Sequence, residues 1–187
     1  MKYANLSWHN SDIANSNVQL VNMGDKLQFW SVDYIYRQMG IPDVQIVKLE
    51  TKDVMTYDGE EELLLPINFS LFCKKFMREE KIAISSKIIP LFIGVYLGYY
   101  EERYFNDFNI NYLKKYGPVG CRDEETVRLL RKSGVEAYLS GCVTHLLPYY
   151  GVTGNNVFFV DVPLELKDHI PWNLRMQAEC LSNQFYY

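Results

Sequence analysis

The sequence predicts an α/β domain in which a mainly parallel sheet lies between two layers of helices. Short β-branched runs alternate with segments of helical periodicity along most of the chain. Residues 88–96 are apolar at nearly every position, as in a strand covered on both faces. Parallel strands need crossover connections, and a helix is the usual one. We therefore predict one three-layer domain over residues 1–187.

The first predicted helix covers residues 25–39, whose apolar side chains recur at roughly helical spacing. Ser70 fits an N-cap and predicts a second helix directly after it. The clearest helix covers residues 123–132, because acidic residues occupy the end where the helix dipole is positive. The other predicted helices are 104–116 and 172–185, and the predicted strands are 44–49, 62–65, 88–96, 119–121, 137–140 and 157–162.

The inward positions of these elements predict the hydrophobic core. Each is an apolar residue on the side of its helix or strand that the periodicity turns toward the neighbouring layer. The predicted core includes Leu27, Ile46, Phe92, Leu130, Leu139 and Phe159.

Composition and charge exclude several classes of function. The net charge of −4 gives no general attraction to nucleic acid or anionic lipid. The longest apolar run falls short of the ~20 residues that cross a bilayer. Because the N-terminal stretch also lacks an apolar export signal, we expect a cytoplasmic protein. The four cysteines lack a CxxC pair, so we expect reduced thiols and no metal site.

Three segments lie at predicted strand ends or helix starts: residues 22–25, 120–123 and 140–144. Each combines a glycine, which lets backbone approach a ligand closely, with a polar side chain near helix amides that favour anions. In a parallel sheet these ends meet at one edge, which is where such sheets bind ligands. A structural role competes with this interpretation. Gly24 could serve to open a turn and Asp25 to cap a helix, with neither residue binding a ligand.

Arg122 is the most informative of these residues, because it comes directly after a strand and directly before a helix. Its guanidinium could bind a phosphate or a carboxylate at the edge of the sheet. A salt bridge to Glu124, Glu125 or another carboxylate is the alternative. Cys142 and His145 are close enough for a thiolate pair or half of a metal site, but a packing role for Cys142 is favoured because no second ligand pair has suitable spacing.

A longer pattern resembles a known family. The segment GPVGCRDEETVRLLRKSGVEAYLSGCVTHLLP at residues 117–148 is similar to the central segment of the polysaccharide pyruvyl transferases. The pieces VNMGDKLQFW, LLLPINFSLF, IIPLFIGVYLG and FFVDVP resemble other family segments in the family's order. The resemblance implies a Rossmann-like half of a two-domain, glycosyltransferase-B-like fold. It also implies transfer of pyruvate from phosphoenolpyruvate to a sugar of a cell-surface or exopolysaccharide as a ketal.

The resemblance also points to site residues. The family's N-x-G-D element corresponds to Asn22, Gly24 and Asp25, and its R-D element corresponds to Arg122 and Asp123. With Ser140 and Gly141 at the next strand end, these form the predicted substrate-binding set. No catalytic residue is assigned, and no cofactor is expected beside the donor substrate, phosphoenolpyruvate.

Family members usually carry a second domain that supplies a donor-binding arginine and histidine. We therefore expect the isolated chain to turn over little phosphoenolpyruvate, because a cleft enzyme positions donor and acceptor between two walls. The expected partners are the small-molecule donor and a glycan acceptor. One alternative is a non-catalytic domain that binds a sugar or nucleotide sugar, and another is a truncated half that needs a partner or a second domain. A third is a homo-oligomer whose contact surface carries the many aromatic residues.

Overall fold

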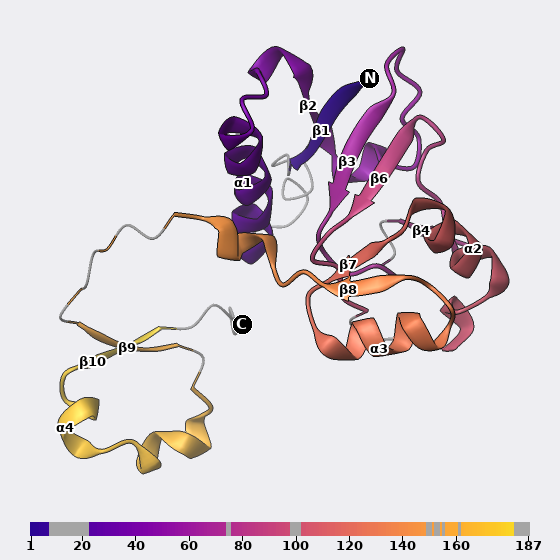
Figure 1. Ribbon diagram of the computed structural model, residues 1–187. Coiled ribbons are helices and arrows are strands. Elements are labelled where there is room, and N and C mark those ends of the chain that lie inside the picture. Colours follow the sequence, from indigo (N-terminus) through magenta and orange to yellow (C-terminus); the bar gives the residue numbers. More distant parts are fainter. Residues whose placement is uncertain are drawn as a thin grey trace. The chain divides into compact units, whose positions relative to one another are not determined.

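A computed structural model gives the fold of this chain (Figure 1). It describes residues 1–7, 23–73, 76–97, 102–148, 151, 154, 156–160 and 162–181. The chain divides into two compact units, Met1–Leu147 and Pro148–Tyr187, which are described separately below.

The larger unit is built on a four-stranded parallel sheet. Its strands follow the order β2 (Ile46–Glu50), β1 (Lys2–Ser7), β3 (Leu63–Ile67) and β6 (Ile88–Phe92). The chain moves outward from β1 to β2, then returns across β1 to β3 and continues to β6. This confirms the prediction of an α/β fold with a mainly parallel sheet, and the order reverses at β1.

Two further parallel strands, β7 (Val119–Cys121) and β8 (Ala137–Leu139), pair with each other beyond β6. Gly94 bends the chain after β6 with a φ of 73°, a conformation that favours glycine. Val95 then pairs with Cys121 as an isolated parallel bridge. The predicted strand 88–96 therefore contributes two consecutive pieces, one beside β3 and one beside β7.

Strand β1 is absent from the sequence prediction, although it occupies an inner position of the sheet. Its sequence, KYANLS, places the buried polar residue Asn5 between two buried apolar ones. The Asn5 amide donates to the carbonyl of Phe29 at 2.8 Å and to Asp33 Oδ1 at 2.7 Å. Because these bonds compensate its burial, a strand without regular alternation can lie at the centre.

Helix α1 (Met23–Gln38) lies against β1 (Figure 1). It buries Gln28, Ser31, Val32 and Tyr36, and Tyr36 Oη donates to the carbonyl of Ala4 at 3.0 Å. The prediction that Leu27 belongs to the core is wrong, since it is 40% exposed. The buried face of α1 includes two hydrogen-bonded polar residues, Gln28 and Ser31. The apolar periodicity of the sequence therefore predicted the wrong face of the helix as the buried one.

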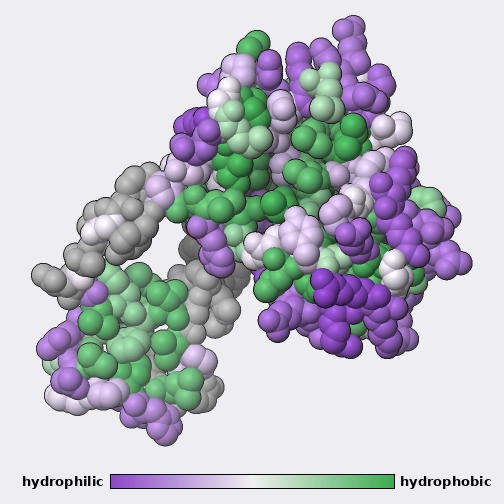
Figure 2. Space-filling model, viewed as in Figure 1, coloured by the Kyte–Doolittle hydropathy of each residue, from purple (hydrophilic) through white to green (hydrophobic). Residues whose placement is uncertain are grey.

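Helices α2 (Asp107–Tyr116) and α3 (Glu124–Lys132) lie at the other end of the sheet, near β6, β7 and β8 (Figure 1). Asn106 caps α2 and Asp123 caps α3, each accepting a backbone N–H three residues on. Hydrophilic side chains gather over α3 on the visible face (Figure 2). Helix α3 buries Val127 and Leu130 on its other side.

The core of the larger unit contains Phe92 and Leu130, as predicted. Ile46 is half-buried. Leu139 is 54% exposed, so its prediction is wrong: in β8 the sheet-facing residue is Ala137. The predicted helix after Ser70 is also absent, because Ser70 pairs with Tyr96 as a parallel bridge and Leu71 and Phe72 form a turn.

Short elements complete this unit. An antiparallel hairpin joins β4 (Met77–Arg78) to β5 (Lys81–Ile82), and its two turn residues, Glu79 and Glu80, both have positive φ. The 3-10 helices are η2 (Asp43–Gln45), η3 (Thr51–Asp53), η4 (Glu102–Tyr104) and η5 (Val143–Leu146).

The smaller unit contains β9 (Val157–Val160), η6 (Leu164–His169), α4 (Trp172–Arg175) and β10 (Ala178–Leu181). Strands β9 and β10 form a separate two-stranded parallel sheet, so the prediction that 157–162 joins the main sheet is wrong. The predicted helix 172–185 is wrong as well, because the chain leaves α4 for β10 within a few residues. Phe159 is half-buried, and apolar side chains cover much of this unit's visible face (Figure 2).

No helix in the described part of the chain combines the length and the apolar character that crossing a bilayer requires.

Candidate functional site

The carboxyl edge of the sheet carries polar groups from several elements. Asn68 follows β3, Gly94 follows β6, Arg122 follows β7 and Ser140 follows β8. In open α/β sheets, ligands bind beyond the carboxyl ends of the strands, near the point where the strand order reverses. Here that point lies between β1 and β3. A side chain that reaches the end of β3 therefore lies near this point.

Arg122 reaches from β7 to the end of β3 and to helix α1. Its Nη2 donates to the carbonyl of Asn68 at 2.7 Å and to Gln28 Oε1 at 2.9 Å. Its Nε donates to the carbonyl of Gly94 at 3.3 Å. The guanidinium carbon lies 4.5 Å from the centre of the Tyr96 ring, which is cation–π geometry. The side chain is thus held at the carboxyl edge by four residues from three parts of the chain.

The three hydrogen-bond acceptors of Arg122 are neutral. No carboxylate in the described part of the chain pairs with it, and Glu125 instead accepts two hydrogen bonds from Arg128. The hydrogen bond from Arg128 lowers the pKa of Glu125 below its usual value. Both hydrogens of Arg122 Nη2 are engaged, whereas Nη1 makes no hydrogen bond to any described residue. A half-buried guanidinium that no described carboxylate neutralises, and whose Nη1 donors have no described acceptor, is suited to bind an anion.

Asp123 has a structural role. Its Oδ1 accepts from the backbone N–H of Thr126 at 2.8 Å, and its Oδ2 accepts from the Thr126 hydroxyl at 3.0 Å. Both carboxylate oxygens are therefore engaged at the start of α3. The two residues of the R-D pair therefore have different roles. Asp123 caps the helix that follows β7, and Arg122 extends over the edge of the sheet.

Ser140 and Gly141, which follow β8, contact the bend at Gly94 that follows β6. The Ser140 hydroxyl accepts from the backbone N–H of Gly94 at 2.9 Å and donates to the carbonyl of Cys121 at 3.1 Å. A Cβ at Gly94 would lie 3.0 Å from the carbonyl oxygen of Gly141. Gly94 therefore permits the close approach, and Ser140 fixes the backbone whose carbonyl receives Arg122.

The remaining predicted site residues lie on the segment that leads into α1. Gly24 and Asp25 are inside the first turn of α1, and Gly24 is exposed. Asn22 lies outside the described residues, and so does the side chain of Asp25. Gln28 follows Gly24 by about one helical turn, so Arg122 contacts the helix that begins at this element.

Sequence reasoning missed the residues that hold Arg122, namely Gln28, Asn68, Gly94 and Tyr96. One signal was present, because Gln28 and Ser31 place polar side chains among the apolar residues of a helix. Both prove to be buried. Asn68 is also buried, at 1% exposure, and its amide donates to the carbonyl of Gln28 at 3.4 Å.

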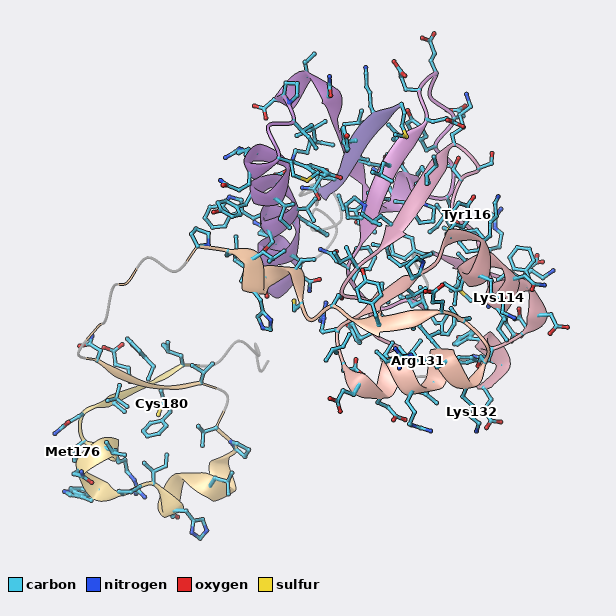
Figure 3. All side chains as sticks on the ribbon, viewed as in Figure 1. Lys114, Tyr116, Arg131, Lys132, Met176 and Cys180 are labelled. Atoms are coloured by element: carbon cyan, nitrogen blue, oxygen red, sulfur yellow. The ribbon has the colours of Figure 1, made fainter. Side chains whose placement is uncertain are left out.

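A groove of about 530 Å³ lies elsewhere, lined by Glu124, Val127, Arg128, Arg131 and Leu139. Arg131, labelled in Figure 3, donates its Nε to the carbonyl of Ala137 at 2.9 Å. The groove thus follows the exposed side of α3 and β8. It includes neither Arg122 nor any of the residues that hold it.

The cysteines differ sharply in environment. Burial, with a smaller contribution from the Asp123 carboxylate, raises the pKa of the Cys121 thiol to about 12. Cys180, labelled in Figure 3, is exposed in β10. The Thr144 hydroxyl contacts Cys142 Sγ at 3.1 Å. Among the described residues no group of three or more potential metal ligands is assembled, around Cys142 and His145 or elsewhere.

We expect iodoacetamide at pH 8 to modify Cys180 quickly and to leave Cys121 unmodified in the native protein. The thiolate is the reacting species, and Cys121 is both buried and protonated at this pH. Peptide mapping by mass spectrometry after timed labelling measures both rates. Labelling in denaturant is the control, since all cysteines should then react. Equal native rates for Cys121 and Cys180 would contradict the burial of β7.

Comparison with known proteins gives one family match. The family model described as polysaccharide pyruvyl transferase matches residues 22–176 of the 187-residue chain. The matched range includes α1, the carboxyl ends of β3, β6, β7 and β8, and every residue that holds Arg122. No curated protein and no solved structure matched this chain.

Proposed function

Because the chain belongs to the polysaccharide pyruvyl transferase family, we propose that it takes part in the transfer of pyruvate from phosphoenolpyruvate to a sugar of a cell-surface or exopolysaccharide. The product is a ketal that bridges two hydroxyl groups of the sugar. The edge of the sheet around Arg122 is the part of this chain that we assign to substrate binding.

The reaction balances without an oxidant or a reductant. The two hydroxyl oxygens each form a bond to C2 of phosphoenolpyruvate, while the C2=C3 π bond and the bond from C2 to the phosphate oxygen break. C3 takes up one proton and becomes the methyl group. The two hydroxyl groups lose one proton each, which balances the proton gained by C3 and the proton that leaves with phosphate. Such chemistry needs a proton donor, a base and cationic groups that hold the phosphate and carboxylate.

The observation that carries the proposal is the geometry of Arg122. Its guanidinium lies at the carboxyl edge of a parallel sheet, held by neutral acceptors, with Nη1 free among the described residues. A planar group with two free donors matches the oxygens of a phosphate or carboxylate. Phosphoenolpyruvate carries both groups, and a nucleotide sugar carries phosphates.

The strand order supports the finer proposal of a Rossmann-like domain, one half of a glycosyltransferase-B-like fold. The strands β2, β1, β3 and β6 are all parallel and their order reverses at β1, and the bridge from Val95 to Cys121 continues the series to β7 and β8. In such a sheet the reversal creates a crevice for a ligand. Arg122 extends toward this crevice through its bond to the carbonyl of Asn68.

We expect Arg122→Ala to weaken the binding of phosphoenolpyruvate by about 1.5–3 kcal/mol, roughly 10- to 100-fold in Kd, which is typical of a hydrogen bond to a charged group. Isothermal titration calorimetry of wild type and variant measures the change, and nucleotide sugars are titrated in parallel. Melting curves establish that both proteins are folded.

Arg128→Ala is the matched control, because Arg128 is an exposed arginine on α3 that forms an ion pair with Glu125. Its removal should cost about 0–1 kcal/mol of stability and leave affinity unchanged. Equal affinities of wild type and Arg122→Ala would remove Arg122 from the site. Binding with negligible formation of a pyruvylated glycan is the result expected of this chain alone, and efficient pyruvylation would contradict that expectation.

A further inference from the structure

Gln28 stands out because it is a buried polar residue on the inward face of α1. It is 8% exposed, and its side-chain oxygen accepts from Arg122 Nη2 at 2.9 Å. Its backbone carbonyl accepts from the Asn68 amide at 3.4 Å. Burying an amide is unfavourable unless its groups are hydrogen-bonded. The bond to Arg122 supplies that compensation and ties α1 to the loop after β7.

The contacts of Arg122 fix the orientation of its guanidinium. One face lies over the Tyr96 ring, Nε is bonded to the carbonyl of Gly94, and Nη2 is bonded to Asn68 and Gln28. With three hydrogen bonds and one cation–π contact, rotation about the last side-chain bonds is restricted. Of the three acceptors, only Gln28 acts through its side chain, so it is the one that a substitution can alter.

The chemical type of this acceptor decides whether the positive charge stays available. A carboxylate of the same length would hold Nη2 equally well, but it would form a salt bridge and compete with any bound anion. An amide holds the group without neutralising it. We propose that Gln28 is a positioning residue, which orients the Arg122 guanidinium toward an anionic substrate without itself neutralising the positive charge. The inference rests on the proposed function, because it assigns the anion to the same edge of the sheet.

The test compares Gln28→Glu, Gln28→Met and Gln45→Glu with the wild type. Gln45 is exposed in η2, so Gln45→Glu makes the same change of charge away from Arg122. Phosphoenolpyruvate and inorganic phosphate are the probes, and calorimetry gives Kd. Melting curves and the NMR signal of the Arg122 Nε–H, identified by its loss in Arg122→Ala, report on the guanidinium without any ligand.

We expect Gln28→Glu to weaken the binding of phosphoenolpyruvate by roughly tenfold or more. The new carboxylate competes with the ligand for Arg122, and a hydrogen bond between charged groups contributes about that much to affinity. Its melting temperature should stay at or above that of the wild type, because the new ion pair satisfies both groups. Gln45→Glu should change Kd by no more than about twofold, because substitutions at exposed positions away from a site usually have small effects. Gln28→Met should shift or broaden the Nε–H signal, because it removes the acceptor that orients the group.

Loss of affinity together with loss of stability in Gln28→Glu would overturn the inference, because it would show a packing role. Equal Kd values for Gln28→Glu and Gln45→Glu would also overturn it, while leaving the proposed function intact if Arg122→Ala still binds weakly. Failure of the wild type to bind either probe would overturn the proposed function. In that case, an unchanged Nε–H signal in Gln28→Met would show in addition that Gln28 does not hold Arg122.

Discussion

Replacing Phe92 with alanine should lower the free energy of unfolding by about 3–5 kcal/mol, the usual cost of truncating a buried phenylalanine. Phe92 is 1% exposed in β6. Its ring makes an edge-to-face contact with the Tyr112 ring of α2, with centroids 6.5 Å apart. The substitution removes both the buried apolar area and this contact between sheet and helix, and the cavity lies among residues that can collapse only partly.

Phe108→Ala is the control for this measurement, since Phe108 is 48% exposed on α2. It lies near Lys81, with the ammonium 5.5 Å from the ring centre, and its removal should cost less than about 1 kcal/mol. Urea denaturation followed by far-ultraviolet circular dichroism gives both values. Similar losses for the two variants would show that β6 is not the centre of the core.

Replacing Asn109 with alanine should cost about 3–5 kcal/mol, because three hydrogen bonds are lost and a buried N–H is left without an acceptor. Asn109 is fully buried in α2. Its Oδ1 accepts from the backbone N–H of Ile82, and its Nδ2 donates to the carbonyls of Glu80 and Tyr104, each at 2.8 Å. One side chain therefore fixes the β4–β5 hairpin to α2.

Asn111→Ala tests the same substitution at an exposed position of the same helix. We expect it to be neutral or slightly stabilising, because alanine has the higher helix propensity and no buried bond is lost. Thermal denaturation of both variants, with hydrogen exchange at Ile82, separates the two outcomes. Rapid exchange at Ile82 in the wild type would contradict the bond from its N–H to Asn109.

The elements that sequence predicted best are those whose signals are local. Strand β7 and helix α3 lie where the sequence predicts them, because glycine, a capping aspartate and charged helix ends delimit them without reference to the rest of the fold. Strand β1 was missed because its irregular pattern depends on a partner for Asn5 that is supplied by α1. The periodicity at 172–185 predicted a helix, yet the chain pairs with β9 there, and such pairing depends on distant residues.

The candidate site likewise depends on residues that are distant in the sequence, which local patterns cannot predict. Sequence could place Arg122 at the end of a strand, because both its neighbours in the chain are clearly delimited. It could not find Gln28 or Asn68, which lie 94 and 54 positions away from Arg122 and contact it only through the fold. Leu27 was wrongly assigned to the core for a related reason: the buried face of α1 combines polar Gln28 and Ser31 with apolar residues, so it does not follow the apolar periodicity. Departures from a regular apolar pattern are expected where a fold supports a function.

The network around Arg122 also implies an order of events during synthesis. Gln28, Asn68 and Gly94, which supply the acceptors, all precede Arg122 in the chain. Strands β1, β2, β3 and β6 are all synthesised before β7, and chains generally begin to fold from the N-terminal side. The hydrogen-bond acceptors are thus synthesised first, and the positively charged side chain of Arg122 follows. Ser140, which fixes the backbone of Gly94, is synthesised later still, so the arrangement that we assign to anion binding is completed only after β8 has been made.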